Sequence, residues 1–486
     1  MKYYLGVDAG TTNVKAALLD EHFTAVDRES AAVVNHSPFT GACETDMEAY
    51  WAAVCRVLRN LMARSGGRQV AGICVVGQGD GCWPLDGAGR PVRPAILWND
   101  TRAKALNRLP DPEYDGIAHA NGANGLLAGS VGAILCWLRQ FEPESFGKIR
   151  WALHCKDFLN FRLTGVVCTD ITDASTALTD VLNSRYVPQL LDRLEMPERI
   201  LPPILESAEI VGRVTAEAAA ATGLPEGLPV ACGALDVCGT AVGSDLLRPG
   251  MACSVIGTTL ANQMVLDETD ARSGRARVLL VRHAVPGLYV NILSTLSGTT
   301  SLDYARQLFC PSGTWEEADA LAATAPAGCD GLVFLPYLRG ERAPFTNPFA
   351  SGAYAGIRPE HTRAHFLRAA YEGLAYSFRD CFDSFPREAA ETYLAGGGAQ
   401  NAFLARMFAD LLGKTCLRVR EREQGILGAV RILWKALGQA EDFTSFPTLE
   451  ADRFEPRPAE GQAYQKSFAR FVAVRRQMEP IYEQLG

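Results

Sequence analysis

A repeated strand–turn–strand pattern constrains the fold of this chain more than any other feature of its sequence. Each copy has two short apolar strands joined by a Gly-Thr-Thr turn. The segments are Tyr3–Asp8, Gly10–Thr12 and Val14–Leu19 in the first copy, and Met251–Ile256, Gly257–Thr259 and Leu260–Leu266 in the second. From Gly10 to Gly257 the offset is 247 residues, about half of the 486-residue chain. Repetition at half-chain spacing predicts a duplicated domain.

The segments between the two hairpins alternate in type. Helical periodicity over Met47–Arg64, Gly129–Gln140 and His154–Leu163 is interrupted by apolar strand segments such as Val70–Val76 and Val230–Leu235. Alternation of this kind predicts the α/β class. A chain of this length exceeds what one hydrophobic core supports. We therefore predict two domains, residues 1–245 and 246–486.

The second half of the chain repeats this alternation. A third Gly-Thr-Thr stands at Gly298–Thr300 and leads into a predicted helix. A strand is expected over Gly331–Pro336, and helices over Arg363–Phe382 and Asn401–Leu412. A glycine run, Gly396–Gly398, precedes the last of these helices. It is either a flexible strand-to-helix loop or a place where the adenosine part of a nucleotide lies against bare backbone.

Composition excludes several classes of partner. The net charge of −8 is spread without a basic block, which argues against nucleic acid or an acidic membrane surface as the main partner. No apolar run approaches 18 residues, and Asp8 and Gly10 interrupt the first apolar stretch before the core of a signal peptide forms. The 14 cysteines form no CxxC pair, and the 7 histidines do not cluster with them. Reduced thiols in a cytoplasmic protein without structural zinc are expected.

The two Gly-Thr-Thr hairpins are candidate phosphate-binding sites. Glycine lets the backbone approach an anion, turn amides point at it, and threonine hydroxyls add donors. Lys15, which alternates with Asn13 on the first return strand, adds a positive charge. Either hairpin alone is as well explained by ordinary turn preference. Together they favour a polyphosphate held between two domains.

Two carboxylates, Asp8 and Asp236, end apolar strands beside glycines. Asp8 is either a satisfied turn carboxylate or a group that binds Mg²⁺, which prefers hard oxygen ligands. Asp236 is either the N-cap of a helix over Val237–Gly243 or a base that accepts a hydroxyl proton during phosphoryl transfer.

Two polar segments are suited to a polyol. VVGQGDGCW contains Gln78 and Asp80, and LWNDTR contains Trp98, Asp100 and Arg102. Amide, carboxylate, guanidinium and an indole face are the groups that bind sugars, which offer both donors and acceptors. The alternative is a polar surface loop with Trp98 in the core.

Six segments in order resemble the FGGY carbohydrate kinases over nearly the whole chain. They are VDAGTTNVK, GALDVCGTAVG, SVIGTTL, YLRGERAPFTNPFASGAYAG, HTRAHFLRAAYEGLAYS and AGGGAQNAF. The resemblance implies two actin-like domains of the ribonuclease-H type with an ATP cleft between them. It also implies ATP and Mg²⁺ in that cleft and the sugar mainly on the N-terminal domain.

The resemblance assigns roles to residues that match the family's motifs. Asp236 matches the catalytic base, and Asp8 with Asp236 the Mg²⁺ site. The substrate positions are Gln78, Asp80, Trp98, Asp100 and Asp236. The ATP positions are Thr11, Thr12, Asn13, Lys15, Gly257, Thr258, Thr259, Gly298, Gly397 and Asn401.

Branches of the family are mixed in this sequence. The xylulokinase branch usually carries histidine at the position of Asp80, whereas GQGDG resembles the erythritol kinase branch. WNDTR resembles xylulokinases, and LPPILESAEIVGRVTAEAAAATGL resembles L-xylulose-type kinases. The residue types do not fix the stereochemistry of the substrate.

We therefore predict an ATP-dependent kinase that phosphorylates a primary hydroxyl of a small sugar, first of all a xylulose-type pentulose. A polyol kinase of the erythritol or glycerol type is the alternative. A chaperone-like ATPase and a non-catalytic sugar or ATP sensor are the alternatives from other classes. The expected partner is a small sugar or polyol, and neither nucleic acid nor a membrane is expected as a partner. The sequence leaves open whether the chain forms a homodimer.

Overall fold

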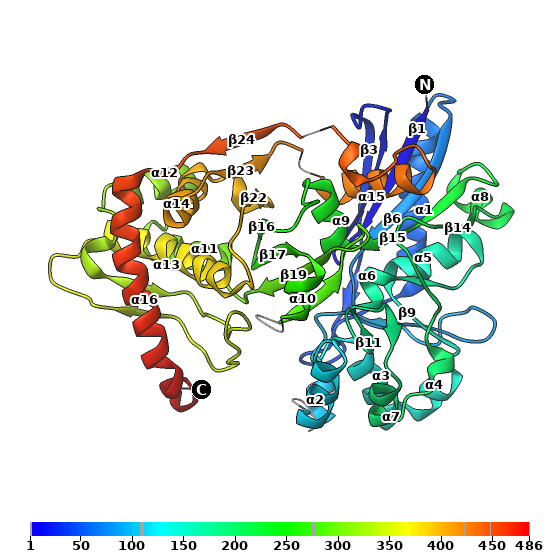
Figure 1. Cartoon of the computed structure of the whole chain (residues 1–486), viewed down its shortest axis with the longest axis horizontal. Helices are drawn as coiled ribbons and strands as arrows, with labels where there is room; N and C mark the ends of the chain where they lie inside the picture. Colours follow the sequence, from blue (N-terminus) through cyan, green and yellow to red (C-terminus); the bar gives the residue numbers. More distant parts are fainter. Residues whose placement is uncertain (1, 107–110, 274–277, 422, 448, 486) are drawn as a thin grey trace. The chain divides into compact units, whose positions relative to one another are not determined.

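The computed structural model describes residues 2–106, 111–273, 278–421, 423–447 and 449–485. The chain is built of mixed helices and strands (Figure 1), which confirms the predicted α/β class. It divides into two compact units. The first unit comprises Met1–Leu247, Leu279–Val290 and Glu423–Thr448, and the second comprises Arg248–Val278, Asn291–Arg422 and Leu449–Gly486. The predicted division at residue 245 stays a prediction.

The first unit is organised around a six-stranded sheet with the strand order β14-β15-β6-β1-β2-β3. Its strands are β1 (Tyr3–Ala9), β2 (Asn13–Leu19), β3 (Ala25–Ala32), β6 (Val70–Gly77), β14 (Ile210–Arg213) and β15 (Pro229–Leu235). Strand β1 pairs antiparallel with β2 and parallel with β6, and β6 pairs parallel with β15. The three central parallel strands therefore end at one edge of the sheet.

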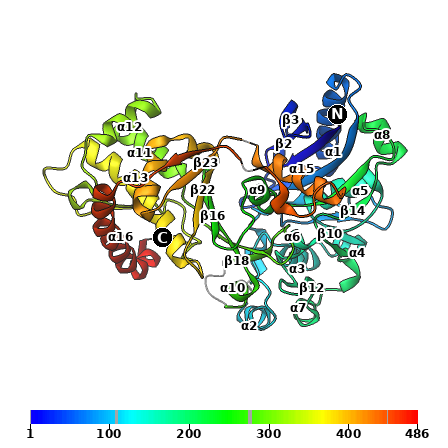
Figure 2. The same cartoon turned by 45° about the horizontal axis from the view of Figure 1, so that its top comes forward.

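Helices cover both faces of this sheet. Those whose apolar residues share one core with it are α1 (Met47–Arg64), α5 (Cys155–Thr164) and α8 (Ala216–Thr222). On β1, Leu5 and Val7 point into that core, and the alternating residues Gly6 and Asp8 face the other way. There β1 packs against α15 (Gln424–Ala436), drawn in orange beside β1 and β6 in Figures 1 and 2.

Helix α15 packs closely because several contact positions are glycines. A Cβ on Gly6 would lie 2.7 Å from the carbonyl oxygen of Ile426. A Cβ on Gly428 would lie 1.8 Å from the carbonyl oxygen of Gly239, which belongs to α9 (Asp236–Gly243). The absent side chains let α15 lie directly on β1 and α9. This contact fixes the helix that begins with Asp236.

A helical region separates β6 from β14. Its helices are α2 (Pro112–Ala120), α3 (Val131–Phe141), α4 (Pro143–Lys148), α6 (Ile171–Ala174) and α7 (Pro188–Leu194). Its own apolar core includes Tyr114, Ile134 and Leu191. The region also carries the Trp98 segment and the short helix α6, and both return toward the strand ends of the sheet, as contacts of Trp98 with Thr11 and of α6 with β15 show.

The second unit repeats the same strand arrangement. Six consecutive strands of its seven-stranded sheet run in the order β19-β17-β16-β22-β23-β24. The strands are β16 (Met251–Ile256), β17 (Leu260–Leu266), β19 (Tyr289–Ser294), β22 (Glu391–Ala395), β23 (Cys416–Val419) and β24 (Ala451–Phe454). As in the first unit, the hairpin strand β16 pairs antiparallel with β17 and parallel with β22. Both predicted Gly-Thr-Thr hairpins are therefore present, each at the centre of a sheet.

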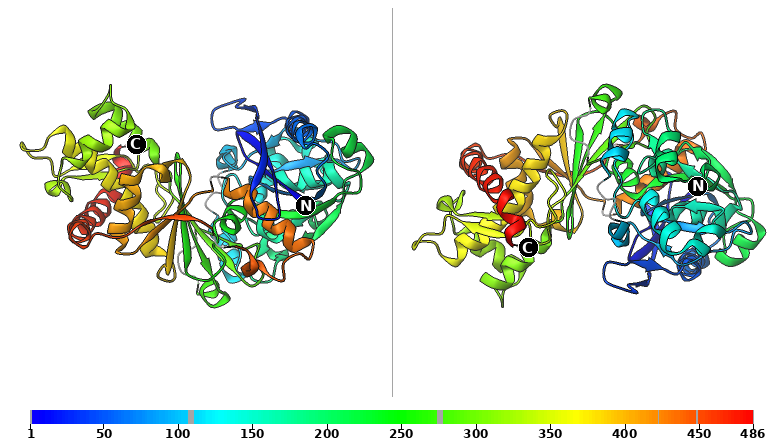
Figure 3. Two further views of the ribbon diagram at one scale, coloured as in Figure 1. Left: turned by 90° about the horizontal axis from the view of Figure 1, so that it is seen from above. Right: turned by 90° about the horizontal axis from the view of Figure 1, so that it is seen from below.

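Four helices of the second unit, α11, α12, α14 and α16, pack against the buried helix α13, whereas α10 packs against β17. The bounds of these helices are α10 (Glu268–Arg272), α11 (Thr299–Phe309), α12 (Trp315–Ala323), α13 (Arg363–Ser384), α14 (Ala402–Leu412) and α16 (Pro458–Leu485). The C-terminal helix α16, red in Figure 3, packs beside α13 and α14. The expected helices over Arg363–Phe382 and Asn401–Leu412 are thus confirmed within two residues at each end.

Two global properties bear on the sequence interpretation. Every helix among the described residues is too short or too polar to span a bilayer. All fourteen cysteines are free thiols, and all but Cys43 and Cys310 are buried. Burial raises the pKa of several of them, including Cys55 to about 11. These thiols behave as small apolar core residues.

Candidate active site

Three neighbouring strand ends assemble the candidate site of the first unit. Ala9 of β1 pairs with Gly77 of β6, and Gly77 pairs with Leu235 of β15. The residues that follow these three positions are the Gly-Thr-Thr turn, Gln78 and Asp236. Sheet register thus brings to one edge groups that lie far apart in the sequence. The carboxyl edge of parallel strands is a usual place for ligands in α/β proteins.

Asp236 is the first residue of α9, not its N-cap as the alternative interpretation held. Its Oδ1 accepts a 2.7 Å hydrogen bond from the backbone N–H of Val237, the next residue. Burial, with smaller contributions from the charges of Asp8 and Asp173, raises the pKa of Asp236 to about 7. A carboxylate with such a pKa is suited to accept a proton near neutrality.

Asp8 lies on the sheet face covered by α15. A Cβ on Gly425 would approach Asp8 Oδ2 to 3.0 Å, so only glycine leaves room for the carboxylate there. Burial raises the pKa of Asp8 to about 6, although the Lys15 charge opposes the shift. Lys15 Nζ itself lies 2.9 Å from Glu423 Oε2, just before α15. The predicted phosphate-binding lysine therefore has an acidic partner that sequence reasoning did not identify.

A chain of hydrogen bonds connects the first hairpin to the predicted sugar-binding residues. Trp98 Nε1 donates to Thr11 Oγ1 at 3.0 Å, and Thr11 Oγ1 donates to Gln78 Oε1 at 3.1 Å. Gln78 is buried, whereas Trp98 is 44% exposed, so its indole face is open to a ligand. The alternative that placed Trp98 in the core is wrong. The hairpin turn also holds Thr12 and Asn13, whose side chains are exposed and joined at 3.2 Å.

The two other predicted substrate residues differ in their surroundings. Asp80 has a left-handed backbone, with φ +53°, which aspartate tolerates better than most side chains. Asp100 is buried, and its carboxylate accepts from the Arg102 guanidinium at 2.8 Å and from the Cys43 backbone N–H at 2.7 Å. The Asp100–Arg102 pair thereby fixes the loop that carries Trp98.

In the second unit, the second and third Gly-Thr-Thr segments lie against each other. The Thr299 N–H donates to the Gly257 carbonyl at 2.9 Å, and Thr300 Oγ1 donates to the Thr258 carbonyl at 3.0 Å. A Cβ on Gly298 would lie 2.6 Å from both of these hairpin carbonyls. Gly298 thus allows the start of α11 to pack on the turn that ends at Thr259.

The glycine run joins the same cluster. Gly396 has φ +81°, and a Cβ there would lie 2.6 Å from the Ile256 carbonyl, one residue before the hairpin turn. Around Gly397 a Cβ would meet no atom within 4 Å, so its backbone borders open space. Asn401 caps α14 through Leu404 N–H and donates to both oxygens of Asp319. Sequence reasoning did not identify Asp319.

The two halves of the chain match the two domains of one protein family. Residues 3–243 match the N-terminal domain of the FGGY family of carbohydrate kinases, and residues 242–437 match its C-terminal domain. The chain belongs to the FGGY family of carbohydrate kinases. It is accordingly a sugar kinase, a phosphotransferase with an alcohol group as acceptor, with two domains of the actin-like fold.

Individual relatives differ in their substrates. The chain is 31% identical to L-xylulose/3-keto-L-gulonate kinase of Escherichia coli, over 97% of this chain and 96% of that protein. It is 29% identical to erythritol kinase of Brucella abortus, over 99% and 97%. The crystal structure of xylulose kinase from Rhodospirillum rubrum superposes with a TM-score of 0.90 at 30% identity, covering 99% of this chain and 100% of that chain.

Proposed function

We propose that this kinase transfers the γ-phosphoryl group of ATP to a primary hydroxyl of a small carbohydrate. The observation that carries the proposal is the register of β1, β6 and β15. It brings the first Gly-Thr-Thr turn, Gln78 and the carboxylate of Asp236 to one edge of one sheet. A phosphate-binding turn, a polyol-binding set and a base are the parts that phosphoryl transfer to an alcohol requires.

In the proposed reaction, Asp236 accepts the proton of the attacking hydroxyl. A bond forms between that oxygen and the γ-phosphorus, and the bond from the γ-phosphorus to the β–γ bridging oxygen breaks, releasing ADP. The Val237 N–H holds Oδ1 of Asp236, so its orientation is set before substrate binds. Turn amides of the hairpins stabilise the charge that develops on the transferring group.

The proposed ATP ligands come from both units. In the first unit they are Thr11, Thr12, Asn13 and Lys15. In the second unit they are Gly257, Thr258, Thr259, Gly298, Gly397 and Asn401. In the second set, Gly298 lets the start of α11 pack on the hairpin turn, and the backbone of Gly397 borders open space.

Asp8 and Asp236 fit a hard divalent cation. Both carboxylates have raised pKa values, and the Asp8 charge contributes to the shift at Asp236. A bound Mg²⁺ would relieve this cost, since it prefers carboxylate and water oxygens. Mg²⁺ supplies charge neutralisation on the phosphates of ATP when bound.

For the substrate, a xylulose-type pentulose is our first candidate and a four-carbon or three-carbon polyol the second. Gln78, Asp80, Trp98 and Asp100 are its proposed contacts. The second candidate is supported by Asp80, which stands where the xylulokinase branch usually has histidine, and by the similarity to erythritol kinase. Specificity depends on the hydrogen-bond geometry around these groups. We also propose a cytoplasmic location, because all fourteen cysteines are free thiols.

A coupled ADP-release assay at fixed MgATP tests the proposal across pentuloses, tetritols, hexuloses and glycerol. Release that rises strongly with one pentulose supports the first candidate, and release that rises with a tetritol or glycerol supports the second. Release that does not depend on any carbohydrate would indicate an ATPase. Binding of sugar without release would indicate a sensor, and both outcomes would contradict the proposal.

A further inference from the structure

The end of strand β15 is held by a side chain from another element. Gly233 has φ +79°, and a β-bulge interrupts the pairing of β15 with β6 between Ala231 and Ala234. Beyond the bulge, the Leu235 N–H donates at 2.8 Å to the hydroxyl of Thr172 on α6. Leu235 directly precedes Asp236. The Thr172 hydroxyl therefore holds the backbone immediately before Asp236, the proposed base.

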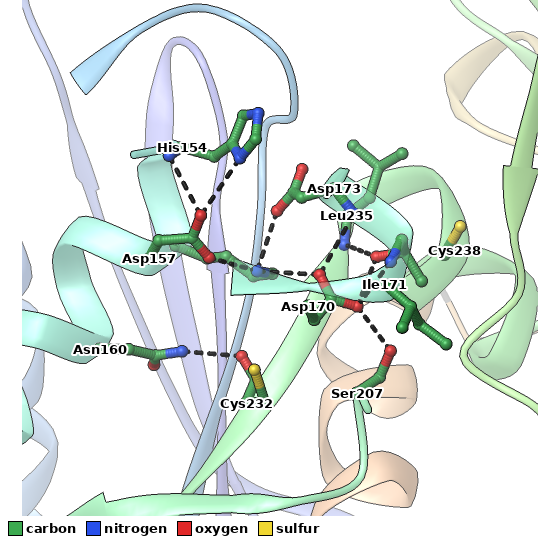
Figure 4. A network of polar contacts seen from close by, with 12 residues as sticks. His154, Asp157, Asn160, Asp170, Ile171, Asp173, Ser207, Cys232, Leu235 and Cys238 are labelled. Atoms are coloured by element: carbon green, nitrogen blue, oxygen red, sulfur yellow. Dashed lines mark hydrogen bonds and ion pairs between the residues drawn. The ribbon is translucent and has the colours of Figure 1, made fainter. Parts of the chain in front are cut away.

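Thr172 is itself fixed by a buried carboxylate. Its hydroxyl donates to Asp170 Oδ2 at 2.8 Å, and its backbone N–H donates to the same oxygen at 3.0 Å. Asp170 Oδ1 lies 2.9 Å from Nζ of Lys156 on α5. Lys156, Asp170 and Thr172 are all fully buried. A continuous path of one ion pair and two hydrogen bonds thus leads from Lys156 through Asp170 and Thr172 to Leu235. Figure 4 shows Asp170 and Leu235 within this network of polar contacts.

Lys156 is surrounded by acidic groups. Its ammonium lies 2.5 Å from Asp157 and 3.0 Å from Asp173, in addition to Asp170. Although burial opposes it, these three carboxylates raise the pKa of Lys156 well above its ordinary value. Asp157 in turn accepts from His154 Nδ1 at 3.1 Å. Burying such a group of charges costs free energy. The best-attested role of buried charged groups is to specify one conformation.

The same cluster borders the loop predicted to bind sugar. A Cβ on Gly79, between Gln78 and Asp80, would lie 2.9 Å from Asp173 Oδ1 and 1.9 Å from Leu235 Cδ1. The loop, the end of β15 and the buried cluster are therefore in direct contact. A shift of α6 would move the strand end that precedes Asp236 and disturb the loop that follows β6.

We propose that Thr172, held by Asp170 and Lys156, is a positioning residue that fixes the backbone at Leu235 and thereby aims Asp236 at the accepting hydroxyl. This inference rests on the proposed function of Asp236. Thr172 acts through its contact with the Leu235 peptide. A small displacement of a catalytic group is enough to slow a reaction by one to two orders of magnitude.

A matched pair of variants separates positioning from general stability. Thr222, like Thr172, is a fully buried threonine. In both residues the hydroxyl accepts a hydrogen bond from a backbone N–H and donates one to an oxygen atom. The Thr222 hydroxyl accepts from Leu224 at 3.2 Å and donates to the Ala218 carbonyl at 2.6 Å. T172V and T222V therefore remove the same kind of hydroxyl from the same unit, but only T172V releases Leu235.

The kinetic part compares T172V, T172S and T222V under the conditions in which the wild type phosphorylates its best carbohydrate. We expect kcat to fall about 10- to 100-fold in T172V, with the KM for MgATP within 2-fold of the wild-type value. In T172S and T222V, kcat should stay within 2-fold of the wild-type value. In a D236N background, T172V should add no further loss of kcat. Equal losses in T172V and T222V, or additive losses with D236N, would overturn the inference.

Hydrogen exchange provides a readout independent of activity. In T172V the amides around Leu235 should exchange at least 10-fold faster than in wild type, whereas T222V should leave them unchanged. Unchanged exchange at Leu235 in T172V would overturn the inference even if kcat fell. A wild-type chain that phosphorylates no carbohydrate would instead refute the proposed function, while the exchange comparison would still decide whether Thr172 holds β15.

Discussion

Individual side chains at the strand ends carry the chemistry proposed for this kinase. Asp236 and Gln78 follow residues that are paired across β15 and β6, and Thr11 joins Gln78 to Trp98 through its hydroxyl. Strand register places Asp236 and Gln78, whereas hydrogen bonds place Thr11 and Trp98. Substitution of a single side chain therefore tests the role proposed for it.

Replacing Asp236 by asparagine tests the base directly. Asparagine keeps the shape and can accept the Val237 N–H, but it does not take a proton from the substrate hydroxyl. We expect D236N to reduce kcat by about 10²- to 10⁴-fold, the usual contribution of general base catalysis, with MgATP affinity largely retained. Steady-state kinetics and titration calorimetry measure the two effects. Turnover near that of wild type would show that Asp236 is not the base.

Glu341, in the RGERAPF segment, provides a pH-dependent stability test. Its Oε1 accepts from the backbone N–H groups of Leu296 and Arg342, and burial raises its pKa to about 7 from an ordinary 4.5. A raised folded-state pKa means that the protonated form favours folding and that this stability is lost as pH rises from 4.5 through 7. The loss is roughly 3 kcal/mol at most.

The E341Q variant carries a neutral side chain at every pH. The unfolding temperature of wild type should therefore fall relative to that of E341Q between pH 5 and pH 8. E360Q, which replaces an exposed glutamate, is the control. The difference in unfolding temperature between wild type and E360Q should not change in this way between pH 5 and pH 8. Parallel pH profiles for wild type and E341Q would contradict a raised pKa at Glu341.

The proposed site residues were chosen from the sequence alone, but their partners in the structure could not be. Asp8 and Asp236 are visible as carboxylates that end apolar strands. Glu423 beside Lys15 and Asp319 beside Asn401 are contacts between distant segments, which no local pattern contains. The buried threonine Thr172 resembles any other polar residue in a short helix until the bulge in β15 is known.

Glycines let secondary-structure elements of this protein pack closely at the candidate site. Gly298 brings the start of α11 onto the second hairpin, and Gly428 brings α15 onto α9. Substitution of such a glycine moves whole elements. Its effects should therefore extend beyond the substituted position.

For the second unit, G298A is the sharpest test of this arrangement. The added Cβ would lie 2.6 Å from the carbonyl oxygens of Gly257 and Thr258, which are backbone atoms and cannot yield without moving the hairpin. If the hairpin binds ATP phosphates, the KM for MgATP should rise at least 10-fold, with a smaller change in carbohydrate binding. G147A, at an exposed position with no atom within 4 Å of the added Cβ, is the control and should behave as wild type. An unchanged KM in G298A would remove Gly298 and the adjoining turn from the ATP site.

Element predictions succeeded where periodicity was long or turn chemistry was strong. The helix predicted over Met47–Arg64 is α1 with the same limits, because an apolar stripe, the N-cap of Asp46 and a polar opposite face all agree. The interpretation of Asp236 as an N-cap was wrong by one position. Helix ends are set by backbone contacts such as the one between Leu235 and Thr172, which sequence patterns do not contain.

The whole molecule shows a duplication that the two hairpins had indicated. Strand order around β1 and around β16 is the same, with an antiparallel hairpin partner on one side and a parallel strand on the other. What the half-chain spacing could not indicate is that the first unit also contains Leu279–Val290 and Glu423–Thr448. Amphipathic periodicity in α15 predicts a buried face but does not say which sheet it covers.

The recruited helix α15 leads to a prediction about folding. Ile426, Val430 and Leu433 are buried where α15 lies on Gly6 and Gly72, on the sheet face opposite α1. Burial of each such side chain contributes about 1.5–3 kcal/mol. A fragment of residues 1–245, the first domain as predicted from sequence, would leave that face and the α9 helix uncovered.

We therefore expect the 1–245 fragment to lack a cooperative thermal unfolding transition and to bind a hydrophobic dye. A second fragment that adds Leu279–Val290 and Glu423–Thr448 through Gly/Ser linkers should unfold cooperatively, because α15 then covers the sheet. Circular dichroism and calorimetry distinguish the two fragments. The substitution I426D in the longer fragment should abolish its cooperative unfolding, because a charge would then be buried against the sheet. Cooperative unfolding of residues 1–245 alone would show that the first unit folds without α15 and that its later segments dock on a finished domain.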